Sequence, residues 1–158
     1  GGGSPPWRVH RFDVPELTMV VGHTGKKART GAQVRKVTSF TARQKGFARD
    51  ILREIGDVTL EGVSALRCGD MERLGSLMDR NDRLLAILGV HAPELDRLAS
   101  AARKTSFGAK MIGAGGGGCM MALTDRPRET AEAITRAGGE PYIVKVSREG
   151  ARREESGK

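Results

Sequence analysis

Short apolar runs bounded by glycine or proline predict strands near both ends of the chain and around one glycine-rich segment. Residues 7–12 alternate apolar and polar side chains, which is typical of a half-buried strand. A second run covers residues 17–21 and ends at Gly22, so the two strands resemble an antiparallel pair. Three further strands are expected at residues 109–112, 119–123 and 142–146.

Between these strands, apolar residues recur every three or four positions, which predicts amphipathic helices. The expected helices cover residues 34–55, 58–66, 74–88, 93–102 and 128–137. Gly46 is a candidate break within the first of them. We expect side-chain caps at three helix starts from Thr30, from Asp70, and from Thr124 or Asp125.

The predicted order is two strands, four helices, two strands, one helix and one strand. Because strands and helices are segregated, the order favours an α+β fold in which helices cover an antiparallel sheet of about four to five strands. Residues 7–147 are expected to form this domain. Residues 1–6 are interpreted as a flexible segment or a remnant of cloning, and residues 148–158 as a charged disordered tail.

A glycine-rich segment, residues 113–119, lies between two predicted strands and contains five glycines. Because its flanks are apolar, we interpret it as a tight turn whose successive N–H groups suit an anion such as phosphate. A flexible linker without function is the alternative interpretation. The G-x-G-x-x-G spacing at Gly113, Gly115 and Gly118 does not indicate a dinucleotide fold, because a strand follows it. No Lys-Ser/Thr pair follows, which excludes a Walker A loop.

A second polar segment, residues 23–31, joins a predicted strand to a long predicted helix. It carries Lys26, Lys27 and Arg29, and the start of the helix adds backbone N–H donors, so the loop suits an anionic ligand. A solvated charged face is the alternative, because such runs of charge are common on protein surfaces.

The chain has 158 residues, a formal net charge of +8 and a pI of about 10.1. Such a charge attracts phosphate-bearing partners, including nucleic acid, or an acidic partner protein. Aromatic residues make up only 4%, which disfavours the stacking platforms of single-strand binders. No apolar run is long enough to predict a membrane span. Cys68 and Cys119 have no metal-ligand spacing, so we expect reduced thiols in a cytoplasmic protein.

The histidine and acidic residues show no pattern that is typical of a catalytic site. The three histidines share no metal-ligand spacing and are interpreted as surface or loop residues: His10, His23 and His91. A cluster of acidic residues is interpreted as solvent-facing positions and helix caps: Asp79, Asp82, Glu94 and Asp96. Anion-binding loops without an obvious general base indicate part of a phosphoryl-transfer site, where positioning and charge neutralisation carry most of the catalysis.

Three segments, in this order, resemble the GHMP kinases. Residues 21–30 resemble the G-D-T-G…S-T loop of the mevalonate kinase branch of that family. Residues 77–96 resemble the same branch's pattern of M-x-x-N-H-x-L-L, L-G-V-S and an L-D pair. Residues 110–119, KMIGAGGGGC, resemble the family's third motif, K-x-T-G-A-G-G-G-G-C.

Four positions depart from the family pattern. His23 stands where the family usually has Asp, Asp82 where it has His, His91 where it has Ser, and Ile112 where it has Thr. The acceptor therefore stays open between mevalonate and the substrates of phosphomevalonate kinase, homoserine kinase or a related decarboxylase. A basic module that recognises nucleic acid or another polyanion is the alternative from a different class.

The resemblance implies the C-terminal half of an ATP-dependent small-molecule kinase, with a ferredoxin-like sheet. It implies that a turn faces the phosphate loop of the N-terminal half: Gly113, Ala114, Gly115, Gly116 and Gly117. It also implies that a loop lines the acceptor pocket: Thr24, Gly25, Arg29 and Thr30. Catalytic residues are expected in the missing half, and no metal ligand is expected in this chain.

In the complete enzyme the resemblance implies ATP and Mg²⁺. The expected partners are the N-terminal half of the same kinase and a small-molecule alcohol, with a homodimer left open. Neither a membrane nor nucleic acid is expected as a partner.

Overall fold

The computed structural model describes Asp13 and residues 15–147. Its elements follow the order β1 (Thr18–His23), α1 (Thr30–Arg43), α2 (Lys45–Cys68), α3 (Met71–Ile87), α4 (Pro93–Ala102), β2 (Gly108–Ile112), β3 (Cys119–Leu123), α5 (Pro127–Arg136) and β4 (Glu140–Lys145). The predicted strand at residues 7–12 and the segments 1–6 and 148–158 lie outside the described residues.

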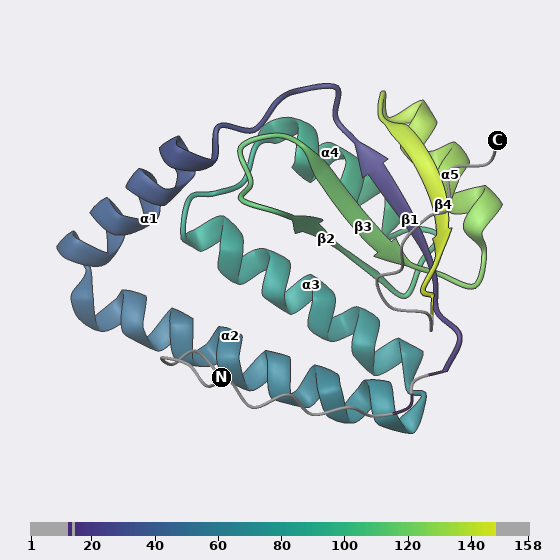
Figure 1. The fold of residues 1–158 in the computed structure, drawn as a ribbon, viewed down its shortest axis with the longest axis horizontal. Coiled ribbons are helices and arrows are strands. Elements are labelled where there is room, and N and C mark those ends of the chain that lie inside the picture. The colour runs from purple at the N-terminus through teal and green to yellow at the C-terminus, as the bar shows by residue number, and fades with distance from the viewer. Residues whose placement is uncertain (1–12, 14, 148–158) are drawn as a thin grey trace, which may run out of the picture.

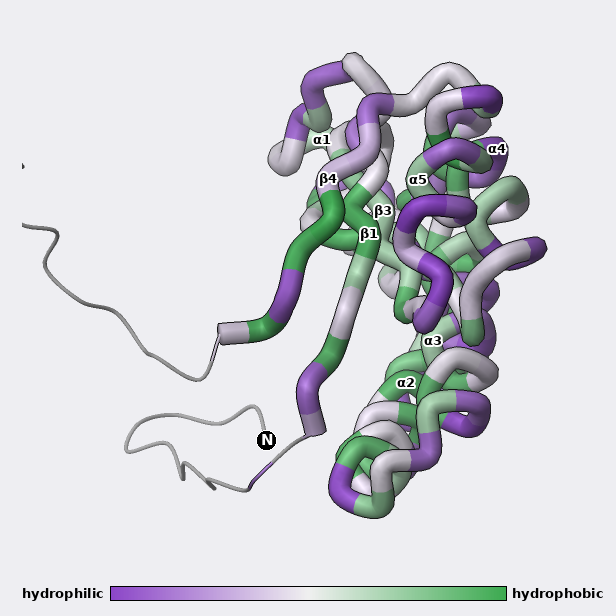
Figure 2. Tube along the Cα trace, turned by 90° about the vertical axis from the view of Figure 1, so that its right-hand side faces the viewer, coloured by the Kyte–Doolittle hydropathy of each residue, from purple (hydrophilic) through white to green (hydrophobic). Residues whose placement is uncertain are grey.

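The four strands form one antiparallel sheet in the order β2-β3-β1-β4 (Figure 1). Helices α4 and α5 pack on one face of this sheet, and α3 packs along β2. Figure 2 shows the strands on one side and α3, α4 and α5 on the other. The predicted α+β fold with a helix-covered antiparallel sheet is confirmed, and the strand order is the ferredoxin-like one.

The main core lies between the sheet and helices α4 and α5. Val20 of β1, Met111 of β2 and Met120 of β3 point from alternate strand positions toward Leu98 of α4 and Ile134 of α5. Each of these five side chains is at most 2% exposed. Burial of such a side chain stabilises the fold by about 1.5–3 kcal/mol, so this layer holds the sheet on its helices.

Helix α2 corrects two predicted boundaries. The chain leaves the helical conformation at Gln44, with φ −123° and ψ 50°, and not at Gly46, which lies in the first turn of α2. No break follows residue 55, so the predicted helix 58–66 is the second half of α2. Val58 and its neighbours pack on α3, and this burial outweighs the cost of about 1 kcal/mol for a glycine inside the helix.

The helix caps agree with the sequence only in part. The cap at Asp70 is confirmed, because its carboxylate accepts a 2.9 Å hydrogen bond from the backbone N–H of the third residue of α3. Thr30 does not cap α1, since Arg29 holds the N-cap position without a side-chain hydrogen bond. Neither Thr124 nor Asp125 holds the N-cap position of α5, which also lacks a side-chain cap.

Some apolar positions of the helices are exposed. Val34, Phe47 and Leu60, which recur at helical spacing, are 58%, 53% and 69% exposed. These helices have only part of their apolar stripe against another described element. None of the helices in residues 15–147 is long and apolar enough to cross a membrane.

Two glycines allow α3 to approach β2 closely. A Cβ at Gly75 of α3 would collide with the backbone of Phe107, and a Cβ at Gly108 would collide with the backbone of Gly75. Asp79 and Asp82 follow four and seven residues after Gly75 and therefore share its face of the helix. The close contact brings both carboxylates to the edge of the sheet.

We expect Gly75→Ala to destabilise the domain by about 1–3 kcal/mol, because the added methyl overpacks the contact between α3 and β2. Gly56→Ala is the matched control, since a Cβ there meets nothing within 4 Å. That control should stabilise the domain by up to about 1 kcal/mol through helix propensity. Urea unfolding midpoints measure both effects, and equal shifts for the two variants would refute the close contact.

Candidate functional site

The glycine turn, residues 113–118, connects β2 directly to β3. Its five glycines all have positive φ, between 72° at Gly116 and 134° at Gly117. Side chains are strained in this region of backbone space, so the turn depends on glycine at each of these positions. The prediction of a tight turn between two strands, with at least one positive φ, is confirmed.

Two neighbouring backbone segments hold the glycine turn. The N–H of Gly116 donates to the carbonyl of Val90 at 2.7 Å, and the N–H of Gly118 donates to the carbonyl of Lys26 at 2.9 Å. A Cβ at Gly115 would collide with the same Val90 carbonyl, and a Cβ at Gly116 would collide with the amide of Gln33. The turn is therefore packed from both sides and cannot accept a larger residue there without rearrangement.

The loop after β1 meets the turn through one residue. Both the N–H and the hydroxyl of Thr24 donate to the carbonyl of Gly118 at 2.9 Å. Of the other predicted pocket residues, Gly25, Arg29 and Thr30 are exposed. Within residues 15–147, none of these three has a hydrogen bond to the turn. The structure thus brings Thr24 to the glycine turn and leaves the other three exposed, Gly25 and Arg29 in the same loop and Thr30 at the start of α1.

Gln33 of α1 was not found by sequence reasoning. It is 7% exposed, and its Oε1 is buried without a hydrogen-bond partner among the described residues. It lines a hollow of about 260 Å³ together with Val34, Val37, Thr38, Val90 and Ala114. A buried acceptor without a donor costs free energy, so the hollow suits a ligand that brings an O–H or N–H group. No sequence pattern indicates that a single glutamine in an amphipathic helix will line a hollow.

Asp82 of α3 is the polar centre behind the turn, and it is only 3% exposed. Its Oδ1 accepts hydrogen bonds from the backbone N–H of Met111 at 2.8 Å and from Nε2 of His91 at 3.1 Å. Its Oδ2 accepts from Arg103 at 2.5 Å. Burial opposes ionisation of Asp82, but the hydrogen bonds from His91, Met111 and Arg103 outweigh it and lower its pKa.

Asp79, one helical turn earlier, binds the same strand. Its Oδ1 accepts from the backbone N–H of Ala109 and from Nε of Arg103, both at 2.8 Å. Arg103 returns a 2.8 Å hydrogen bond to the carbonyl of Ala109. Because β2 lies at the edge of the sheet, these side chains take the place of a further strand. The interpretation of Asp79 and Asp82 as solvent-facing positions or caps is wrong, because the close approach of α3 buries their hydrogen bonds.

His91 lies in the loop between α3 and α4, in agreement with the interpretation as a surface or loop residue, but its ring is held between two carboxylates. Its side chain is 12% exposed, with Nε2 on Asp82 and Nδ1 on Asp96. The hydrogen bond to Asp82 is the main cause that raises the pKa of His91 to about 9, while burial opposes the rise and Asp96 adds to it. His91 is therefore cationic at neutral pH, and the departures at positions 82 and 91 form one ion pair.

The other acidic and histidine positions have simpler surroundings. Glu94 at the start of α4 forms an ion pair with Lys26, which ties the loop after β1 to α4. His23 accepts a 3.3 Å hydrogen bond at Nδ1 from the backbone N–H of Gly25. In the part of the chain that the structure describes, no group of three or more His, Cys, Asp or Glu side chains could hold a metal ion.

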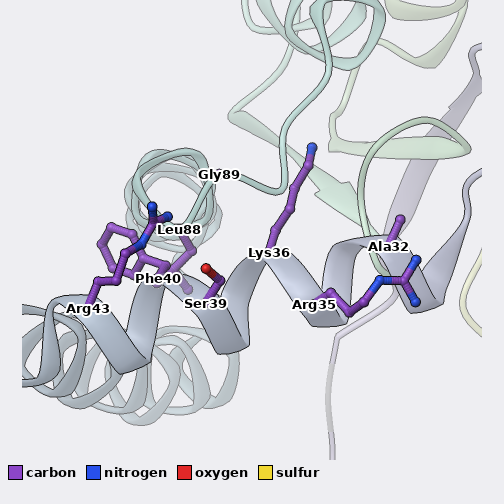
Figure 3. A pocket seen from close by; sticks show the side chains of 8 residues that line it. All are labelled: Ala32, Arg35, Lys36, Ser39, Phe40, Arg43, Leu88 and Gly89. Carbon is purple, nitrogen blue, oxygen red and sulfur yellow. The ribbon is translucent and has the colours of Figure 1, made fainter.

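A basic hollow of about 500 Å³ lies where α1 passes the end of α3. Its cations, Arg35, Lys36 and Arg43, form no ion pair with another described residue. Figure 3 shows that they do not converge: Arg35 extends along the helix toward Ala32, whereas Lys36 reaches toward the segment after α3. The C-terminal end of a helix attracts cations, so Lys36 and Arg43 complement α3 without requiring a ligand.

We expect the domain to lose stability between about pH 6.5 and 9, because His91 is protonated more readily in the folded state, with a pKa of about 9 against 6.5 when unfolded. The stabilisation from protonated His91 is fully present below the unfolded pKa of 6.5 and is lost as the pH rises through the folded pKa of about 9. Unfolding midpoints from pH 6 to 10 measure it, with His91→Asn as control. If the variant loses as much stability over this range as the wild type, the assignment is wrong.

Known proteins resemble this chain in sequence and structure. A family model described as GHMP kinases C terminal matches residues 63–144. The mevalonate kinases of Thermococcus gammatolerans and Pyrococcus furiosus are each 42% identical to it, over 89% of this chain and 44% of the relative. The chain thus spans less than half the length of these relatives.

Solved structures show the same fold. The structure of L. major mevalonate kinase in complex with R-mevalonate matches with a TM-score of 0.72 and 29% identity, over 78% of this chain and 38% of that one. The Methanococcus jannaschii mevalonate kinase matches with a TM-score of 0.69 and 28% identity, over 80% and 38%. With its antiparallel sheet, its glycine turn and these relatives, the chain belongs to the GHMP kinase family, of which it contains the C-terminal domain.

Proposed function

We propose that this chain is the C-terminal domain of an ATP-dependent kinase that phosphorylates the primary hydroxyl of mevalonate. The observation that carries the proposal is the double hydrogen bond from Thr24 to Gly118, because it joins two family-like segments into one site. The curated relatives at 42% identity, which are named mevalonate kinases, support this acceptor over other members of the family.

In this proposal the glycine turn faces the phosphates of ATP and the phosphate loop of the N-terminal half. Gly113 follows β2 directly, is exposed and has a positive φ, so its backbone is open to a phosphate, whereas the N–H groups of Gly116 and Gly118 already donate to the carbonyls of Val90 and Lys26. A Cβ at Gly115 or Gly116 would fill space that the packed turn uses. Mg²⁺ stays a prediction for the complete enzyme, and the proposal assigns none of its ligands to the described residues.

The acceptor pocket is proposed on the other side of Thr24. Arg29 stands at the N-cap position of α1, whose first turn contains no acidic residue. Its guanidinium and the free N–H groups of the helix start suit a carboxylate of the acceptor. Gly25 and Thr30 are exposed beside it, and Oε1 of Gln33, which has no hydrogen-bond partner within residues 15–147, can accept a hydrogen bond from a hydroxyl group.

This domain would contribute positioning and not proton transfer. ATP supplies the phosphoryl group when it is bound, and the residues that activate the acceptor hydroxyl are proposed in the N-terminal half. Thr24 and the glycine turn hold the acceptor loop and the phosphate-facing turn at a fixed spacing, which is what phosphoryl transfer chiefly requires of a protein. The N-terminal half as partner, a homodimer and a cytoplasmic location stay predictions.

The first test is an assay of the chain joined to its N-terminal half, with ATP and each candidate acceptor. We expect phosphorylation of mevalonate, and little or none of phosphomevalonate, homoserine or galactose, because the pocket is proposed for a small carboxylated diol. The chain alone should be inactive. Turnover by the chain alone, or a strong preference for another acceptor, would contradict the proposal.

The second test concerns the glycine turn. Gly115→Ala should lower kcat at least about tenfold in the joined enzyme, since the methyl displaces the turn from Val90 and small misplacements cost large factors in rate. Gly69→Ala is the strain-matched control: its φ is 70° and a Cβ there meets nothing within 4 Å. We expect the control to lose stability but to keep its kcat when folded. Equal kcat values in the two variants would mean that the turn only connects β2 to β3 and has no role in activity.

A further inference from the structure

We propose that Asp82 and His91 are positioning residues that together fix the first part and the middle of the glycine turn, so that the turn keeps one conformation when ATP binds. The inference rests on the proposed kinase function. It concerns how this chain holds the phosphate-facing turn. Asp82 and His91 act on the backbone of the turn through neighbouring residues and do not themselves contact substrate.

The first connection runs through β2. Oδ1 of Asp82 accepts the N–H of Met111 at 2.8 Å, and Met111 lies two residues before the turn. Both residues are buried, at 3% and 2% exposure. A hydrogen bond to a buried carboxylate is stronger than one between neutral groups, so it defines where β2 ends and the turn begins.

The second connection runs through the segment between α3 and α4. The ring of His91 is held from both sides, by Asp82 at 3.1 Å and by Asp96. The preceding residue is Val90, whose carbonyl accepts the N–H of Gly116 at 2.7 Å. A fixed ring fixes the adjoining peptide, so the same ion pair also determines the position of Gly116 in the middle of the turn.

The charges around this pair are balanced only when His91 is protonated. Three carboxylates face the cluster, Asp79 and Asp82 from α3 and Asp96 from α4. Three cationic side chains oppose them: Arg103 after α4, Lys110 of β2 and His91 itself. Loss of the proton from His91 would leave the ring with one N–H for two carboxylates, so either Asp82 or Asp96 would lose its hydrogen bond, and the cluster would carry excess negative charge.

Asp79 is the control that separates a positioning role from a purely stabilising one. It is on the same helix, binds the same strand through the N–H of Ala109 at 2.8 Å, and shares Arg103 with Asp82. Asp79 has no hydrogen bond to His91, whereas Asp82 has one. A residue that only stabilises the edge of the sheet should therefore behave like Asp79.

The experiment compares Asp82→Asn, His91→Asn, the double variant and Asp79→Asn in the chain joined to its N-terminal half. Hydrogen exchange of residues 111–118 and the kinetics with ATP and mevalonate are measured at pH 7. We expect faster exchange in the turn and an about tenfold lower kcat for either single variant, with KM for mevalonate within about threefold. The double variant should have the same turn exchange and kcat as either single variant, because each substitution breaks the same ion pair.

Asp79→Asn should lower the melting temperature but leave turn exchange and kcat near the wild-type values. In the wild type kcat should decrease above about pH 8 to 9, where His91 loses its proton, and His91→Asn should lack this decrease. The inference would be overturned if the Asp82 and His91 variants had the same turn exchange and the same kcat as Asp79→Asn. If the wild type does not phosphorylate mevalonate, the proposed function fails, and hydrogen exchange alone still decides the positioning inference.

Discussion

The structure depends on how the outer edge of β2 is satisfied. An edge strand presents backbone N–H groups that need partners, and here the carboxylates of Asp79 and Asp82 bind those of Ala109 and Met111. This arrangement requires α3 to lie against β2, which the glycine contact between these elements permits. Since β2 leads directly into the glycine turn, the bond between Asp82 and Met111 also determines where the candidate site begins.

Carboxylates in such a place are costly unless they are compensated. Asp82 is 3% exposed, and removing a charge from water costs several kcal/mol before any partner is counted. His91, Arg103 and the N–H of Met111 supply the compensation, which explains why the pKa of Asp82 is lowered despite its burial. An apolar pair of similar size could pack there, but it would leave the N–H groups of the edge strand without acceptors.

Much of the fold could be predicted from the sequence, because it depends on local patterns. The strands on either side of the glycine turn and the helix cap at Asp70 follow from apolar runs and single residues with defined preferences. The candidate site was found in part: the turn and Thr24 meet, while Gln33 was missed.

What the sequence could not show depends on contacts between distant elements. Asp82 and His91 look like ordinary helix and loop residues until α3 is placed against β2. The helix break at Gln44 was also missed, because neither Gln44 nor its neighbours Arg43 and Lys45 is a strong helix breaker, whereas Gly46 is. The family pattern marked positions 82 and 91 as departures, but only their 3.1 Å separation shows that they compensate each other.

The pairing of β1 with β3 has a consequence for folding. β1 meets its partner across the whole of α1 to α4, whereas β2 and β3 are joined by a six-residue turn. Closing the larger loop costs more chain entropy, so the β2–β3 hairpin with α3 and α4 is the natural first nucleus. Thr24 directly follows β1 and can reach Gly118 only when that strand docks. The loop after β1 is then among the last parts to assemble, and the first to be lost when the sheet opens.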